Sequence, residues 1–255
     1  MSTTRAWFPY RKGADDVELF AFPHVGAGST VFSVLRSALS GTGVALIPAV
    51  LPGRERRLRE EPHQDMDSLL AEFEDMAVRD GFSAFTGTYA LLGHCSGALV
   101  AFEIARLLER SPCPNPQLLV VCSSLPPSLI RDTGMSRLPT RDLLARTAAM
   151  GGIPDALMAD PDFVDMMMRP LRADWSVVDR YVDRADSPLT TPILAIRGTG
   201  DPDVSAADLA VWRDQTSGGF STVELESGHW AISRSGSAEL AQAIPAALHT
   251  LWGAA

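Results

Sequence analysis

The stretch Tyr89-Ala-Leu-Leu-Gly-His-Cys-Ser-Gly-Ala98 reads as an apolar strand, a tight turn and the start of a helix. This order is typical of a nucleophile elbow, in which a reactive side chain sits on a strained turn. The backbone doubles back there, so the residues two positions before and after the nucleophile must be small. Ser96 has His94 two positions before it, whereas Cys95 has glycine on both sides. The pattern predicts Cys95 as the nucleophile and Ser96 as a backbone N–H donor to an oxyanion.

Short apolar runs alternate with longer helical stretches on both sides of this elbow. The predicted strands are residues 17–22, 44–50, 89–93, 118–122, 193–197 and 222–225. The predicted helices are residues 29–40, 66–80, 97–109, 206–215 and 237–251. This alternation predicts an α/β fold with a mostly parallel central sheet and helices on both faces.

Residues 126–186 interrupt the alternation because they contain no clear strand. They carry Met135, Met150, Met158 and the run 166–168, with proline and glycine between helical pieces. Methionine fills irregular cores and also lines adaptable binding surfaces. We therefore expect a single domain over residues 1–255, with residues 126–186 as a helical lid insertion.

A cysteine nucleophile needs a base, and the base needs an orienting group. Only His229 and His249 follow Cys95 in the chain, and His249 falls inside the predicted terminal helix. The strand at 193–197 runs into two candidate acids, Asp201 and Asp203. Asp201 comes first after the turn glycines and precedes a proline. The order of residues favours His229 as base and Asp201 as acid.

A second oxyanion donor should come from the loop after an early strand. Residues 22–29, Phe-Pro-His-Val-Gly-Ala-Gly-Ser, fit this place because their glycines allow close backbone approach. Val25 or Gly26 would supply the N–H, and Ser29 would cap the next helix.

Composition and charge argue against several classes of partner and site. The net charge of −9 argues against nucleic acid as a partner, because phosphate binding needs a basic face. No signal peptide and no apolar run of membrane-spanning length is present in the sequence. The three cysteines contain no CxxC pair, which argues against a disulfide framework or a zinc site, and Cys113 and Cys122 are interpreted as structural. A reducing cytoplasm is the simplest location.

Positive charge is locally dense in one segment. It holds the arginines Arg54, Arg56, Arg57 and Arg59. The segment is either a solvated loop or a docking patch for an acidic partner or a phosphate.

These motifs together resemble the type II thioesterases of polyketide synthase and nonribosomal peptide synthetase pathways. The matching pieces span nearly the whole chain. They are Phe22-Pro23-His24, Leu51-Pro52-Gly53-Arg54, Gly93-His94-x-x-Gly97-Ala98, Gly151-Gly152-Ile153-Pro154, Leu171-Arg172-Ala173-Asp174, Asp201-Pro202-x-Val204 and Gly228-His229.

The resemblance implies an α/β-hydrolase fold with a helical lid and an acyl-phosphopantetheine thioester on a carrier protein as substrate. The resemblance also supports Asp201 over Asp203, and it favours the N–H groups of Val25 and Ser96 as oxyanion donors. The sequence shows no metal-ligand spacing and no cofactor motif, and the mechanism needs neither. A monomer suffices for this chemistry, without nucleic acid or membrane.

The chain departs from this family at Cys95, where most members carry serine. An acyl-Cys intermediate is itself a thioester, so exchange with a pantetheine thiol is nearly balanced. We expect hydrolytic removal of acyl groups from carriers (editing), with two alternatives. One is an acyl- or aminoacyltransferase that shuttles the group between carriers through Cys95, and the other is a non-catalytic carrier-binding protein.

Overall fold

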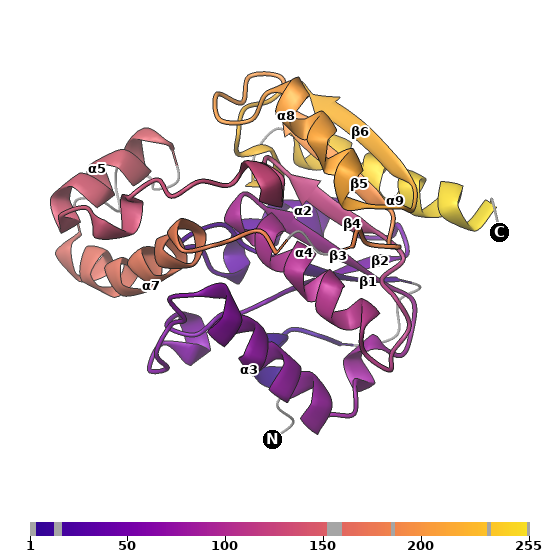
Figure 1. Cartoon of the computed structure of the whole chain (residues 1–255), viewed down its shortest axis with the longest axis horizontal. Helices are drawn as coiled ribbons and strands as arrows, with labels where there is room; N and C mark the ends of the chain where they lie inside the picture. The colour runs from indigo at the N-terminus through magenta and orange to yellow at the C-terminus, as the bar shows by residue number, and fades with distance from the viewer. Residues whose placement is uncertain (1–3, 13–16, 152–159, 185–186, 234–235, 254–255) are drawn as a thin grey trace.

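A computed structural model describes residues 4–12, 17–151, 160–184, 187–233 and 236–253 (Figure 1). Met158 and the motif residues 152–154 lie outside the described residues. The first described helix, α1, is Thr4–Trp7.

A six-stranded parallel sheet forms the centre of the molecule. Its strands are β1 Val17–Phe22, β2 Val44–Pro48, β3 Tyr89–His94, β4 Leu119–Cys122, β5 Ile193–Gly198 and β6 Phe220–Leu225. The order across the sheet is β2-β1-β3-β4-β5-β6, and each neighbouring pair is parallel. All residues of β1, β3 and β4 are buried, which is why these strands read as continuous apolar runs. The predicted α/β fold is confirmed.

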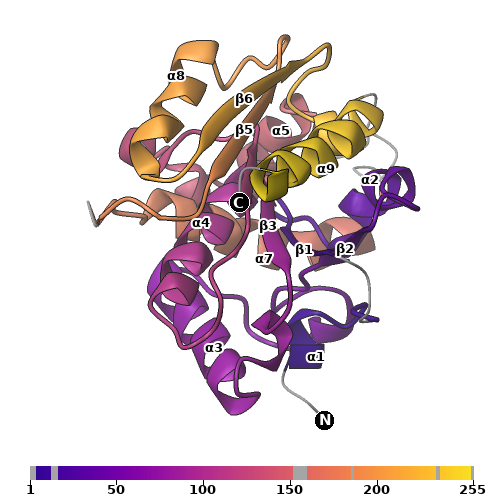
Figure 2. The ribbon, with the colours of Figure 1, turned by 90° about the vertical axis from the view of Figure 1, so that its right-hand side faces the viewer.

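Helices cover both faces of the sheet, as Figures 1 and 2 show. The helices on one face are α3 Met66–Arg79, α4 Ser96–Glu109 and α8 Ala206–Ala210. The helices on the other face are α2 Ser33–Ala38 and α9 Ser237–Gly253. Successive strand side chains alternate between the two layers, so Phe20 packs with α3 and α4 while Leu19 packs with α2 and α9.

Two predicted helices are each split into a 3₁₀ piece and an α piece. The first begins with η1 Ser29–Phe32 and continues as α2, and the second begins with α8 and ends as η6 Val211–Gln215. A capping box between Ser205 and Asp208 starts α8. The remaining short 3₁₀ turns are η2 Glu55–Arg57, η3 Ser83–Phe85, η4 Pro127–Leu129, η5 Met135–Arg137 and η7 Ala231–Ser233.

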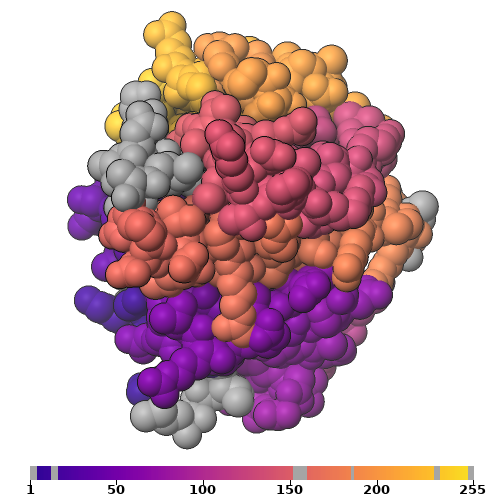
Figure 3. Space-filling view, turned by 90° about the vertical axis from the view of Figure 1, so that its left-hand side faces the viewer, coloured from indigo at the N-terminus to yellow at the C-terminus, as the bar shows by residue number. Residues whose placement is uncertain are grey.

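Between β4 and β5 the described chain is helical. It contains η4, η5, α5 Thr140–Ala149 and α7 Pro161–Asp179, and these two helices project to one side of the sheet (Figure 1). Asp160 caps α7 by accepting from two backbone N–H groups, and Pro161 stands at its first position. Figure 3 shows α7 lying between the pink segment of α5 and the purple segment that follows β2. Within the described ranges, no helix is both long and apolar enough to cross a membrane.

Candidate active site

Cys95 stands at the junction of β3 and α4 with a positive φ of 53° and ψ of −124°, a strained backbone conformation for a residue other than glycine. Its backbone N–H donates to the Cys122 carbonyl at 2.9 Å, so the turn is attached to β4. A Cβ on Gly93 would lie 2.3 Å from the Ala98 Cα, and one on Gly97 would lie 2.2 Å from a β1 carbonyl oxygen. Backbone therefore approaches both flanking positions, which explains the two glycines around Cys95.

His229 and Asp201 are brought together at the same edge of the sheet. His229 Nδ1 lies 3.0 and 3.1 Å from the two carboxylate oxygens of Asp201, and both residues are buried. Asp203 Oδ2 is 3.8 Å from the same nitrogen, and its side chain is 49% exposed. The C-terminal end of β5 also packs closely on the loop that follows β6 and carries His229, since a Cβ on Gly198 would lie 2.2 Å from the Ser227 carbonyl oxygen.

The charges of this pair stabilise each other. Burial lowers the pKa of His229, but the hydrogen bond to Asp201 and the proximity of Cys95 outweigh it and raise the pKa to about 10. Burial raises the pKa of Asp201, while the hydrogen bond and charge of His229 lower it to a net value below 3.8. The buried His229 Nε2 makes no hydrogen bond of normal geometry to any described residue. The imidazole is thus held protonated at neutral pH, with Nε2 available to a reacting group.

The same side chains include atoms that could bind a metal ion. Among the described residues, Asp201, Asp203 and His229 form the one group of three potential metal ligands. The Nδ1 of His229 already donates to Asp201, so that nitrogen cannot offer a lone pair to a cation in the same state. Acid–base pairing explains the arrangement.

The loop after β1 holds the second predicted oxyanion donor. The Gly26 N–H donates to Asp174 Oδ2 at 2.7 Å, which removes Gly26 from the two candidates and leaves Val25. Neither Val25 nor Ser96 donates its backbone N–H to a protein group in the described part of the chain. The predicted cap at Ser29 is wrong, because Ser29 Oγ and N–H both donate to Glu55 instead.

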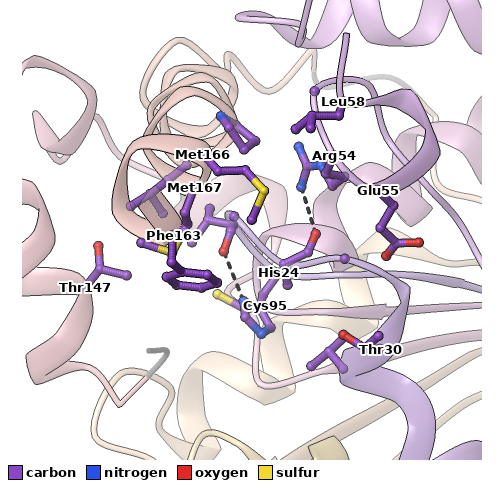
Figure 4. Close-up of a pocket in the computed structure, with 18 of the residues that line it drawn as sticks. His24, Thr30, Arg54, Glu55, Leu58, Cys95, Thr147, Phe163, Met166 and Met167 are labelled. Atoms are coloured by element: carbon purple, nitrogen blue, oxygen red, sulfur yellow. Dashed lines mark hydrogen bonds between the residues drawn. The ribbon is translucent and has the colours of Figure 1, made fainter. Parts of the chain in front are cut away.

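A cavity of about 500 Å³ lies directly above Cys95 (Figure 4). Its walls are mostly apolar side chains from the loop after β1, η1, the segment after β2, the C-terminal end of α5, α7 and the loop that carries His229. They include Val25, Val31, Leu58, Met150, Phe163, Met166, Met167, Pro170, Leu171 and Trp230. Of these, Leu58 and Met166 are exposed, which places the mouth between the segment after β2 and α7. The volume suits one small-molecule group.

The predicted arginine patch needs correction, because two of its four members are buried. Arg54 pairs with Asp174 on α7, and Arg57 donates to Glu72 and to the Val50 carbonyl. These guanidinium groups lie inside the molecule because each finds a carboxylate there. They belong neither to a solvated loop nor to a docking surface. Arg56 and Arg59 remain exposed.

Three further aromatic residues surround the site without having been predicted. His24 and Trp230 stack edge-to-face with ring centroids 4.6 Å apart, and His94 Nε2 lies 2.8 Å from the His229 carbonyl oxygen. Burial lowers the pKa of His24 to about 4 and the pKa of His94 well below its usual value. Both rings are therefore neutral at physiological pH. In the sequence, His24 and His94 stand only within motifs, and no spacing indicates the contacts of these three rings.

The other cysteines are poorly suited to act as the nucleophile, and His249, the second histidine that follows Cys95, lies outside this site. Burial raises the pKa of Cys122 to about 12 and also raises the pKa of Cys113, which makes both poor nucleophiles. His249 is exposed on α9. All three cysteines are free thiols.

Comparison with known proteins gives a consistent result. A family model described as a thioesterase domain matches residues 17–248. Thioesterase PikA5 of Streptomyces venezuelae is 31% identical over 217 residues, which cover 85% of this chain and 76% of that protein.

Solved structures of similar proteins superpose over nearly the whole chain. RedJ, a thioesterase from the prodiginine biosynthetic pathway of Streptomyces coelicolor, gives a TM-score of 0.83 at 30% identity and covers 95% of this chain and 98% of its own. YbtT, a type II thioesterase from the yersiniabactin NRPS/PKS pathway, gives 0.79 at 25% identity, covering 91% and 93%. These matches confirm the predicted α/β-hydrolase fold.

Proposed function

The chain belongs to the thioesterase family, whose members hydrolyse thioesters, and on that premise we propose that it removes acyl groups from carrier proteins through an acyl-Cys95 intermediate. The carriers are those of polyketide or nonribosomal peptide biosynthesis, because the similar proteins are type II thioesterases of such pathways. The hydrolysis edits carriers by clearing the groups they hold. A reducing cytoplasm would keep the thiol free.

One observation carries the proposal. Cys95 occupies the elbow beside the hydrogen-bonded pair of His229 and Asp201, at the floor of an apolar cavity. A nucleophile, a base and an orienting carboxylate are the three groups that acyl transfer requires. The proximity of Cys95 is one of the causes that raise the pKa of His229, as expected for a base placed to take the proton of the thiol.

The acylation step follows from this arrangement. The Cys95 thiolate attacks the thioester carbonyl carbon, a new C–S bond forms, and the carbonyl oxygen becomes an oxyanion. The N–H groups of Val25 and Ser96 are the proposed donors to that oxygen. The intermediate collapses, the C–S bond to pantetheine breaks, and the pantetheine thiolate takes the proton from His229 Nε2.

The deacylation step uses the same residues in reverse. His229 is now neutral and accepts a proton from a water molecule, which attacks the acyl-Cys95 carbonyl. The C–S bond to Cys95 breaks, the free acid leaves, and the thiolate–imidazolium pair is restored. Asp201 keeps the imidazole oriented in both steps.

The helices α5 and α7 form the proposed lid. The cavity that leads to Cys95 is lined by Phe163, Met166 and Met167 of α7 and by Met150, the residue that directly follows α5. Flexible thioether side chains adapt to different apolar shapes. The acyl group therefore lies between the lid and the β1 loop, with the pantetheine arm entering past Met166.

A second function is favoured by the identity of the nucleophile. An acyl-Cys95 thioester is as reactive as the carrier thioester it came from, so a second pantetheine thiol can take the group in place of water. The thiol attacks the acyl carbon, its proton goes to His229, and Cys95 leaves as thiolate. The chain would then shuttle acyl or aminoacyl groups between carriers.

One experiment separates these functions. The protein is mixed with an acyl-loaded carrier and a second, empty carrier, and intact masses of all three are followed over time. Hydrolysis predicts free acid and an empty second carrier, whereas shuttling predicts acyl mass on Cys95 and then on the second carrier. A Cys95→Ala variant is the control. If Cys95 never gains the acyl mass and no acid forms, the chain is a non-catalytic carrier-binding protein.

A further inference from the structure

A buried ion pair joins α7 to the loop that holds the proposed oxyanion donor. Asp174 on α7 accepts from Arg54 through both carboxylate oxygens, at 2.7 and 2.8 Å. Arg54 also donates to the Ala27 carbonyl at 2.8 Å, and Asp174 accepts from the Gly26 N–H at 2.7 Å. The two side chains are only 7% and 13% exposed. One pair of charges thus holds two consecutive loop residues against the helix.

These contacts fix the peptide group next to the Val25 N–H. The carbonyl of the Val25–Gly26 peptide accepts from His24 Nδ1 at 3.1 Å, and its N–H donates to Asp174. A planar peptide held at both ends cannot rotate. The direction of the Val25 N–H relative to Cys95 therefore depends on where Asp174 stands.

The same helix forms a wall of the cavity. Pro170 and Leu171 line the cavity, and Asp174 follows them by about one helical turn. A Cβ on Gly26 would lie 3.0 Å from Leu171 Cδ1, so helix and loop are in close contact. Figure 3 shows α7 packed along the segment that follows β2, the segment that supplies Arg54. An acyl group that pushes Pro170 and Leu171 outward must also displace Asp174, because all three residues lie on α7.

We propose that Arg54 and Asp174 are positioning residues that couple the fit of the acyl group to the oxyanion donor at Val25. An acyl group that fits leaves the pair intact and is transferred quickly. One that forces α7 outward turns the Val25 N–H away from the reacting oxygen. Selection among acyl groups then appears in the rate of Cys95 acylation and not in binding. The inference rests on the proposed acyl-Cys95 mechanism.

The test compares two reactions of the same thiol. Acylation by acyl-pantetheine thioesters of increasing chain length builds an oxyanion, whereas alkylation by iodoacetamide does not. Asp174→Asn keeps the shape of the side chain but replaces one acceptor oxygen with an amide that repels the donors of Gly26 and Arg54. Losing one oxyanion donor costs about 10²–10³-fold in rate. We expect acylation to fall by about 10²-fold for the preferred chain, with a flattened chain-length profile, while alkylation stays within about threefold.

Two further variants control for folding. Arg169 lies on the same helix as Asp174 and forms an exposed ion pair with Glu61 of the segment after β2, so Arg169→Gln should leave both reactions unchanged. Arg54→Lys keeps the charge but loses the bidentate geometry, so it should reproduce the effect if Asp174→Asn does not fold. Unchanged acylation in both pair variants, or an equal loss of acylation and alkylation, would overturn the inference. Absence of acylation in the wild-type protein would instead overturn the proposed function, and the inference with it.

Discussion

Gly97 offers a direct test of the geometry that brings nucleophile and oxyanion donors together. A Cβ at this position would lie 2.2 Å from the Phe22 carbonyl oxygen and 2.5 Å from that of Pro23. Both oxygens belong to the backbone. Phe22 is the last residue of β1, and Pro23 begins the loop that carries Val25. We predict that Gly97→Ala forces α4 and this loop apart.

The size of the effect follows from the distances. A Cβ essentially never lies closer than 3.0 Å to another heavy atom, so the backbone must move by about 0.8 Å, the difference between 3.0 and 2.2 Å. Overpacking of this kind costs about 1–3 kcal/mol in the free energy of unfolding. For a chain of this length each kcal/mol lowers Tm by about 2–4 °C, which gives about 2–12 °C. A displacement near 1 Å between reacting groups slows the chemical step by about 10²-fold.

The assay pairs thermal unfolding with the rate at which Cys95 gains an acyl group, followed by intact mass in a single turnover. Gly87→Ala is the matched control, because nothing lies within 4 Å of a Cβ there and its φ is not positive. The control should change the unfolding free energy by less than about 0.5 kcal/mol. If Gly97→Ala matched Gly87→Ala in both Tm and acylation rate, the close approach of α4 to the β1 loop would not control the site.

Three predictions concern the acid–base pair and the thiol. Asp201→Asn should slow acylation by up to about 10⁴-fold because the imidazole loses its orientation, whereas Asp203→Asn should change the rate by less than about threefold; stopped-flow release of pantetheine thiol checks both. The pKa of His229 lies above its usual 6.5, so the stability its charge contributes is complete below pH 6.5 and is lost as the pH rises through about 10. The rate of Cys95 acylation should fall over the same rise in pH. The His229 pKa measured by NMR should be lower in Cys95→Ala, and an unchanged value would contradict the proximity of His229 to Cys95. For hydrolysis, Cys95→Ser should retain free-acid release, while for shuttling it should trap a stable oxygen ester, and intact mass distinguishes them.

The sheet was predictable because most of its strands are buried on both faces. A strand such as β3 must be apolar at every position, so its limits are visible in composition alone. The edge strand β6 shows the opposite case. Its burial is mixed, and the predicted run 222–225 misses the first two residues of Phe220–Leu225. The core strands could be located from the sequence, but the edge of the sheet was less defined.

The contacts between distant segments were not predictable. Arg54 reads as one of four clustered cations, and its partner Asp174 lies 120 positions further along the chain. Likewise Trp230 Nε1 donates to the Met150 carbonyl at 2.6 Å, which connects the histidine loop to the end of α5. Charge and spacing indicate that a residue is polar or aromatic, but only the fold determines which side chain pairs with which.

The histidines around Cys95 show how burial decides which charge the site carries. His24, His94 and His229 are all buried near one another, with centroids of neighbouring rings 5.4 Å apart. A second imidazolium at that distance would lower the pKa of His229 by repulsion. Burial lowers the pKa values of His24 and His94, while Asp201 opposes the same effect at His229. Among these three rings the positive charge is therefore confined to His229, the ring that pairs with Asp201 and the one proposed to give a proton to the leaving pantetheine.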